Sequence, residues 1–261
     1  MRSLSIAATG MLAQQLNVET ISNNIANMST TGFKRQRAEF QDLLYQNQRR
    51  VGAQSSDSGT VVPAGVQLGV GVKTAAVYRI TEQGNLTTTG NPLDIALQGK
   101  GYFAIELPTG DTAYTRSGSF QLSADGKIVT ADGFTVRGAG TIPKDAIDVT
   151  INANGEVLVK QPGKTALSRV GQFELASFAN DAGLQATGDN LFMQTAASGD
   201  AVSGTPGKAG FASTLQGFLE TANVNTVQEV TNLITAQRAY EMNSKVIQAS
   251  DEMLQTLNQL R

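Results

Sequence analysis

The C-terminal end of the chain decides how the molecule is built, and from Thr226 to Arg261 it reads TVQEVTNLITAQRAYEMNSKVIQASDEMLQTLNQLR. This stretch contains neither Gly nor Pro, the two residues that most often interrupt a helix. Large apolar side chains recur in it at seven-residue spacing along two neighbouring rows, which is typical of one helix face. We therefore predict one long helix with a broad apolar stripe. The rows are Ala239, Val246, Met253 and Leu260, and beside them Leu233, Tyr240, Ile247 and Leu254.

The N-terminal end carries a second predicted helix, over residues 3–28. Only Arg2 and Glu19 are charged up to this point, and the other polar residues are mostly Gln, Asn, Ser and Thr. We expect the helix to stop near residues 29–32, where Gly32 can adopt a left-handed cap conformation. A seven-residue apolar row predicts that one face of this helix packs against another helix. The row consists of Leu4, Met11, Val18 and Ile25.

Between the two helices, short strand-like runs alternate with Gly, Asn and Asp. The dipeptides Asp125-Gly126 and Asn154-Gly155 each separate two such runs, which is a strong hairpin signal. Asp132-Gly133 predicts a further turn, and the glycine pairs at 69/71 and 99/101 are interpreted as bulges or close strand crossings. The middle of the chain is therefore predicted to be an antiparallel domain of many short strands. Apolar or alternating runs occur at 66–80, 93–107 and 113–122.

Together these patterns predict an α+β fold with three parts. The N- and C-terminal helices, within 1–30 and 220–261, are predicted to pair as an α-helical coiled coil. Residues 31–70 are predicted to form an extended arm, and residues 71–219 a central antiparallel all-β domain.

The apolar helix faces can be covered in two ways that periodicity does not separate. The helices can pair with each other and leave apolar surface for neighbouring subunits, in which case the ends order on assembly. Alternatively, both helices can pack on the β domain and complete a monomer.

The composition excludes several kinds of chemistry. The chain has 261 residues, a formal net charge of −2, and no Cys, His or Trp. Disulfides, Cys/His zinc sites and Ser-His-Asp triads are therefore impossible. The near-balanced charge argues against nucleic-acid binding, so the basic run KRQR at 34–37 is interpreted as solvated surface or a subunit contact.

Two further expectations concern targeting and catalysis. The N-terminal apolar run meets Gln14-Gln15 and keeps a helical period, so we expect mature sequence instead of a cleaved signal peptide. The enzymatic alternative is a cell-wall-acting carboxylate enzyme with helical interaction appendages, which would need two facing carboxyl groups. The acidic residues of the middle region are scattered among turns, and nothing selects a pair.

Motifs at both ends of the chain resemble those of a known family. Residues 23–35, NNIANMSTTGFKR, closely resemble the N-terminal signature of the bacterial flagellar rod and hook proteins. Residues 219–225, LETANVN, and residues 236–245, AQRAYEMNSK, resemble the C-terminal signature. The stretch 34–46, KRQRAEFQDLLYQ, is similar to the distal-rod members of that family. The resemblance spans essentially the whole chain, with Ala222 standing where the family usually has Ser.

The resemblance implies a structural, non-enzymatic subunit of the distal rod, with no catalytic residue, cofactor or metal. Such subunits assemble into a helical tube that transmits torque to the hook and lines the export channel. The implied location is the periplasm-spanning part of the flagellar basal body, after export without a cleaved signal peptide. The implied partners are other copies of the chain, proximal rod proteins, the hook protein, the P-ring and L-ring bushing proteins, the export apparatus and the rod cap. Neither nucleic acid nor a small-molecule substrate is expected.

We expect the subunit interfaces to lie on the two helices, with residues 46–65 stiffening the arm. Apolar rows would pack the inner tube, while amides near the end of the first helix would satisfy exposed backbone groups or bridge subunits. The expected interface residues are Leu4, Met11, Val18, Ile25, Asn23, Asn24, Asn27, Leu233, Tyr240, Ile247 and Leu254.

Overall fold

The computed structural model describes residues 2–49, 64–164 and 166–259. The chain divides into two compact units. The first, here called the helical unit, comprises Met1–Ile25, Gln36–Tyr78 and Asn225–Arg261, and the second, the β unit, comprises Ala26–Arg35 and Arg79–Val224. Most of the arm predicted over 31–70 is thus grouped with the helices.

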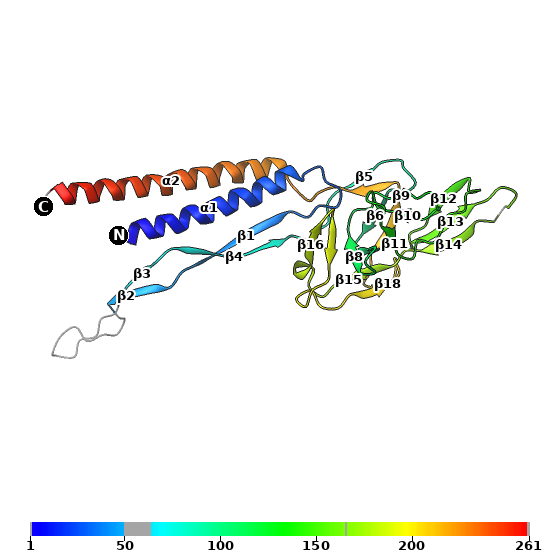
Figure 1. The fold of residues 1–261 in the computed structure, drawn as a ribbon, viewed down its shortest axis with the longest axis horizontal. Coiled ribbons are helices and arrows are strands. Elements are labelled where there is room, and N and C mark those ends of the chain that lie inside the picture. The colour runs from blue at the N-terminus through cyan, green and yellow to red at the C-terminus, as the bar shows by residue number, and fades with distance from the viewer. Residues whose placement is uncertain (1, 50–63, 165, 260–261) are drawn as a thin grey trace. The chain divides into compact units, whose positions relative to one another are not determined.

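The helical unit contains both terminal helices (Figure 1). They are α1, Arg2–Ala26, and α2, Thr226–Gln259. Helix α2 begins where the sequence predicted, because Asn225 caps it: the Asn225 Oδ1 accepts a hydrogen bond from the Gln228 N–H at 3.2 Å. The α+β fold with helical ends is therefore confirmed.

Helix α1 ends at Ala26, two residues before the predicted end at 28. Beside this end, the Asn24 side chain pairs with the backbone of Gln36 through two hydrogen bonds of 2.7 and 2.8 Å. The chain therefore turns back between the end of α1 and Gln36. Gly32 does take a positive φ of 69°, but in that return segment and not next to the helix.

The arm is built from four strands that pair in two steps. Strand β1, Gln36–Asp42, pairs with β4, Val72–Arg79, and β2, Tyr45–Arg49, pairs antiparallel with β3, Val66–Gly69. Strand β2 is exposed along its whole length. Residues 50–63, and with them most of the stretch 46–65 predicted to stiffen the arm, lie outside the described residues.

Gly71 brings the arm close to α1. Its φ is 125°, and a Cβ at this position would lie 2.2 Å from the Oγ1 of Thr9. The Thr9 Oγ1 also accepts a hydrogen bond from the Val72 N–H at 3.3 Å. The predicted close strand crossing is therefore not found at Gly71, where the element that approaches closely is a helix.

The β unit is antiparallel throughout its recorded pairings, as predicted for the middle of the chain. Its largest sheet runs β16-β17-β8-β7-β11-β10-β9, with β15 and β18 attached, and smaller sheets are β12-β13-β14, β19-β6 and β20-β5. The strands are β5 Leu86–Thr88, β6 Ile95–Gln98, β7 Tyr102–Glu106, β8 Thr112–Thr115, β9 Gln121–Leu122, β10 Ile128–Val129, β11 Thr135–Val136, β12 Asp148–Ile151, β13 Glu156–Lys160, β14 Ser168–Gln172, β15 Leu175–Ser177, β16 Gln185–Gly188, β17 Leu191–Met193, β18 Val202–Gly204, β19 Ser213–Gln216 and β20 Phe218–Glu220, with a 3-10 turn at Asp181–Gly183.

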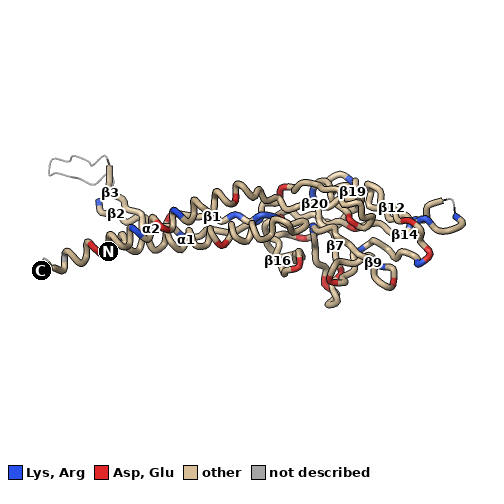
Figure 2. Tube along the Cα trace, turned by 90° about the horizontal axis from the view of Figure 1, so that it is seen from above, with Lys and Arg blue, Asp and Glu red and all other residues tan. Residues whose placement is uncertain are grey.

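The predicted hairpins are confirmed. Gly126 connects β9 to β10 and Gly155 connects β12 to β13, with φ values of 80° and 73° that suit these tight turns. Gly133 turns the chain between β10 and β11. Figure 2 shows blue and red segments close together around β12 and β14.

The core of the β unit is aromatic and aliphatic. Phe103 contacts Phe120 and Phe173 edge-on, with ring centroids 5.0 and 5.8 Å apart. Side chains from β6, β7, β10 and β13 surround them, and every large one is fully buried. This packing supplies the hydrophobic free energy of the unit.

Candidate assembly interface

The two terminal helices contact each other through small and polar side chains. The Ser250 Oγ donates a hydrogen bond to the Ser3 Oγ at 3.2 Å, and the Asn24 Nδ2 donates one to the Glu229 Oε2 at 3.3 Å. The beginning of α1 thus lies against the end of α2, so the helices run antiparallel. Between these two contacts, Gly10 faces the Asn243 amide so closely that a Cβ would lie 2.9 Å from its Nδ2.

The apolar rows predicted as interfaces are not the centre of this contact. Leu4, Met11, Val18 and Ile25 are all only half-buried within the subunit. The fully buried apolar residues of α1 are Ala7, Ala13 and Ile21.

The row expected on α2 is likewise not fully buried within the subunit. Leu233, Ile247 and Leu254 are half-buried, and Tyr240 is 43% exposed. Many other apolar side chains of the helical unit also face outward. On the two helices, the large ones are Ile6, Leu12, Val227, Val230, Ile234, Met242, Val246 and Met253.

The three asparagines near the end of α1 differ in their surroundings. Asn24 is buried and pairs with the backbone of Gln36 in β1, and not with an exposed group at the helix end. Asn23 is exposed, and Asn27 is half-buried and accepts a hydrogen bond from the Thr30 hydroxyl.

A hollow of about 310 Å³ opens between the helices midway along their contact. Gln15 and Val18 line it from α1, and Gln237, Tyr240 and Glu241 line it from α2. Two residues of the predicted apolar rows, Val18 and Tyr240, therefore meet at one opening.

A buried ionic junction, which no sequence pattern predicted, connects distant segments of the β unit. The Glu220 carboxylate accepts hydrogen bonds from the Lys34 Nζ and the Arg116 Nε, both at 2.6 Å, and from the Gly84 N–H at 2.9 Å. The three charged side chains are at most 5% exposed. The interpretation of the whole run at 34–37 as solvated surface or a subunit contact is therefore wrong for Lys34.

Arg116 extends the junction into the glycine-rich turn between β6 and β7. Its guanidinium donates to the carbonyls of Leu97 at 3.2 Å, Gly99 at 2.6 Å and Gly101. Both glycines have positive φ, which turns their carbonyls toward the cation. The only sequence signal for the junction is that Lys34 and Glu220 lie inside the two terminal motifs.

Burial and charge act in opposite directions on the ionisable groups of this junction. Burial alone would raise the pKa of the Glu220 carboxyl, but Arg116 and Lys34 outweigh it and hold that pKa below its usual value. Burial lowers the pKa of Lys34, partly opposed by Glu220. Burial also raises the pKa of Asp181, against the charges of Lys100 and Arg116.

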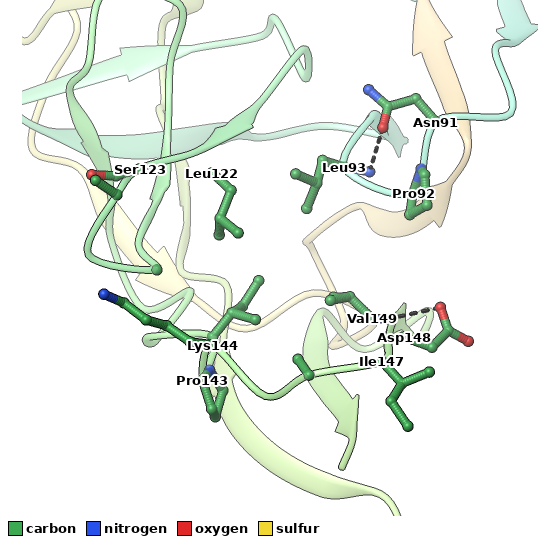
Figure 3. Close-up of a pocket in the computed structure, with 14 residues that line it drawn as sticks. Asn91, Pro92, Leu93, Leu122, Ser123, Pro143, Lys144, Ile147, Asp148 and Val149 are labelled. Carbon is green, nitrogen blue, oxygen red and sulfur yellow. Dashed lines mark hydrogen bonds between the residues drawn. The ribbon is translucent and has the colours of Figure 1, made fainter. Parts of the chain in front are cut away.

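The β unit also has a hollow of about 360 Å³, shown in Figure 3. Leu93, Leu122 and Ile147 line it, and Lys144 lies at its edge. Among the described residues that line it, Asp148 is the one carboxylate, and it accepts a hydrogen bond from the Val149 N–H at 2.9 Å. The hollow therefore lacks the facing carboxyl pair that glycoside hydrolysis requires.

The described part of the chain offers neither a metal-binding cluster nor a membrane-spanning helix. It holds no cluster of three or more acidic residues arranged to bind a metal ion. Neither α1 nor α2, as far as the structure describes them, is long and apolar enough to cross a membrane.

Three family models match the chain. Residues 4–34 match "Flagella basal body rod protein", and residues 96–159 match "Flagellar hook protein FlgE/F/G D1 domain". Residues 215–260 match "Flagellar basal body rod FlgEFG protein C-terminal". The first and last of these matches include Lys34 and Glu220, the two partners of the buried ion pair.

Known proteins match over the whole length. The chain is 60% identical to a protein of Caulobacter vibrioides over 100% of both chains, and 52% identical to one of Agrobacterium fabrum over 97% of both. It is 39% identical to a protein of Bacillus subtilis over 100% of this chain and 99% of the relative. Each of these relatives is named flagellar basal-body rod protein FlgG.

Proposed function

The chain belongs to the family of flagellar basal-body rod proteins, and from this membership we propose that its copies polymerise into a helical, tubular drive shaft. It is a structural subunit of the distal rod, and the family is not a family of enzymes. A cell-wall carboxylate enzyme is not supported by the comparisons or by the hollow described above. We infer that the shaft transmits torque to the hook and surrounds the export channel.

The observation that carries this proposal is the apolar surface left open on the helical unit. Leu12 is 68% exposed and Val227 is 77% exposed, and they belong to a series of large apolar side chains along both helices. So much apolar surface is rare on a soluble monomer and is typical of protein interfaces. Neighbouring copies of the same helices would cover it.

We infer that the helices pair as a coiled coil within the assembled rod. Antiparallel contacts at both ends of the pair support this. In this arrangement the half-buried apolar rows face neighbouring copies, and the surface amides of Asn23 and Asn27 lie where they can bridge subunits. We propose three functional parts, as predicted: the terminal helices, the arm and the β domain. The arm includes β4, Val72–Arg79, and so extends beyond the predicted boundary at 70.

The location of the chain is the flagellar basal body, where it assembles with other flagellar components. We further propose that it spans the periplasm after export without a cleaved signal peptide. Its proposed partners are its own copies, the proximal rod and hook proteins, the P-ring and L-ring bushings, the export apparatus and the rod cap.

The experiment that tests the proposal replaces the chromosomal copy with variants of the apolar rows. Val18→Asp and Tyr240→Asp place a charge at the hollow between the helices, whereas Lys164→Asp reverses a charge on an exposed loop of the β unit. We expect the first two variants to be lost from purified basal bodies and the third to be retained. Retention of both helix variants with normal motility would contradict the proposal.

A further inference from the structure

We propose that a row of small and polar residues sets the register in which α1 and α2 of each subunit pair, and thereby turns the apolar rows toward neighbouring copies. This inference rests on the proposed function, because it assigns the apolar rows to contacts between subunits. The seam, as this row is called below, comprises Ser3, Gly10, Asn17 and Asn24 on α1 and Ser250, Asn243, Ala236 and Glu229 on α2.

The spacing of the observed contacts defines the seam. Ser3 contacts Ser250, Gly10 faces Asn243, and Asn24 contacts Glu229. From the first of these contacts to the second, α1 advances by seven residues while α2 goes back by seven. The interval from the second contact to the third is twice as long on both helices, so one register accounts for all three.

The same register places Asn17 opposite Ala236. Asn17 lies midway between Gly10 and Asn24 along α1. Ala236 is 2% exposed, as a small residue facing the partner helix should be. The hollow lined by Val18 and Gln237 lies beside this level. All four levels of the seam are therefore consistent with one antiparallel pairing.

The side chains of the seam are better suited to select one register than to add stability to the helix pair. A wrong register would separate the buried Asn24 from the buried Glu229 carboxylate. Leaving a buried polar group unpaired is costly, whereas a correctly paired one adds little net stability. Polar residues in helix pairs are known to specify register at the expense of stability.

The seam also explains where the predicted apolar rows lie. Leu4 and Met11 each follow a seam residue by one position, which rotates them by about 100° around α1. On α2, Tyr240 and Ile247 lie four positions beyond seam residues, so they flank the seam. The polar centre therefore holds the two helices of one subunit, and the apolar flanks remain available to other subunits.

Cysteine cross-linking tests the register directly, because the chain has no Cys of its own. The double variant Ser3→Cys/Ser250→Cys replaces two hydroxyl oxygens that are 3.2 Å apart. We expect it to form a disulfide within one chain in purified, oxidised basal bodies. That product runs as a monomer of altered mobility on a non-reducing gel, and reduction restores the original mobility.

The matched control is Ser3→Cys/Asn243→Cys, which is out of register by seven residues, or about 10 Å along α2. We expect no intrachain disulfide from this pair. Co-expression of the two single variants, Ser3→Cys and Ser250→Cys, should yield no linked dimer. A dimer from that mixture, or a monomeric product from the out-of-register pair, would overturn the seam while leaving the rod function intact.

A size-exchange variant provides a second, independent readout. Gly10→Leu should reduce the amount of the chain in basal bodies at least about tenfold, because its side chain meets the Asn243 amide. Gly10→Leu/Asn243→Ala should recover most of that loss, while Asn243→Ala alone should assemble nearly normally. Full assembly of Gly10→Leu, or no recovery in the double variant, would overturn the inference. Absence of the wild-type chain from basal bodies would instead overturn the proposed function.

Discussion

Glu220 shows how one side chain can join segments that are far apart in the sequence. Its carboxylate binds Lys34, which precedes the arm, and Arg116, which follows β8. Removing one partner from a buried ion pair leaves a charge without compensation, which is far more costly than removing a surface pair. The junction is therefore where single substitutions should damage the β unit most.

The first prediction compares a buried with an exposed arginine. Arg116→Met should lower the free energy of unfolding by about 3–5 kcal/mol, because Glu220 loses one of its two charged partners and three buried carbonyl groups lose a donor. Arg169→Met, which removes a 53% exposed partner of Glu156, should cost at most about 1 kcal/mol. Urea unfolding of the full chain, followed by circular dichroism, measures both, and equal losses would count against the junction.

The second prediction concerns pH. Because Arg116 and Lys34 hold the pKa of Glu220 below 4.5 in the folded state, its ionised form stabilises the fold fully above that value. This contribution is lost as the pH falls through the lowered pKa. The stability difference between the wild type and Glu220→Gln should therefore narrow below about pH 4.5.

The effect of Asp181 on the pH dependence of stability is opposite to that of Glu220. Burial raises the pKa of Asp181, so its carboxyl binds a proton more readily in the folded state. Both chains of the comparison retain Asp181, so the difference between them isolates Glu220. Urea unfolding at a series of pH values measures this difference. If the stability difference between the wild type and Glu220→Gln stays constant down to pH 2, the ionisation of Glu220 does not contribute to the stability of the fold.

The elements show what sequence patterns can and cannot predict. Apolar spacing and Asn-Gly or Asp-Gly turns predicted both helices and the hairpins at Gly126 and Gly155, because these signals are local. The pairing face of the helices could not be predicted in this way, since Gly10 and Asn243 carry no apolar signal. The Glu220 junction depends on contacts between residues more than 100 positions apart, which no local pattern reveals.

The third prediction tests how the arm is held to α1. Gly71→Ala should reduce incorporation into basal bodies several-fold, because its φ of 125° is strained for alanine and its Cβ would meet Thr9. Gly71→Ala/Thr9→Ala should recover only part of this loss, because it removes the clash and leaves the backbone strain. Immunoblots of purified basal bodies measure both variants.

A matched control for this pair is Gly133→Ala. Gly133 also has a positive φ, but no atom lies within 4 Å of the added Cβ. A loss as large as that of Gly71→Ala would show that strain alone explains the effect and that contact between arm and helix does not matter.

The two units of the molecule differ in how their apolar side chains are covered. The β unit buries them in its own hydrophobic core, whereas the helical unit leaves apolar faces exposed. Phe103, Phe120 and Phe173 lie in the β unit and need nothing from the terminal helices to pack together. The helices instead expose a series of apolar side chains, among them Leu12 and Val227. Loss of the ends should therefore abolish assembly and leave the β unit folded.

The fourth prediction follows from this separation. Deletion of 2–22 or of 240–261 should remove the chain from basal bodies, because each deletion takes away one side of the helix pair. Either shortened protein, once purified, should retain the β-sheet circular dichroism signal and the cooperative unfolding of the β unit. Normal motility of either deletion strain would contradict the role of the helices.

The most direct test of the structural role is to locate the chain in purified hook–basal bodies. A peptide tag inserted after Gly110, in an open turn between β7 and β8, can be labelled with gold-conjugated antibody. Electron microscopy should then show gold along the rod below the hook in the full-length strain, and none in the strain lacking residues 240–261. Basal bodies with intact rods but no label from an expressed, tagged and functional chain would contradict the assignment.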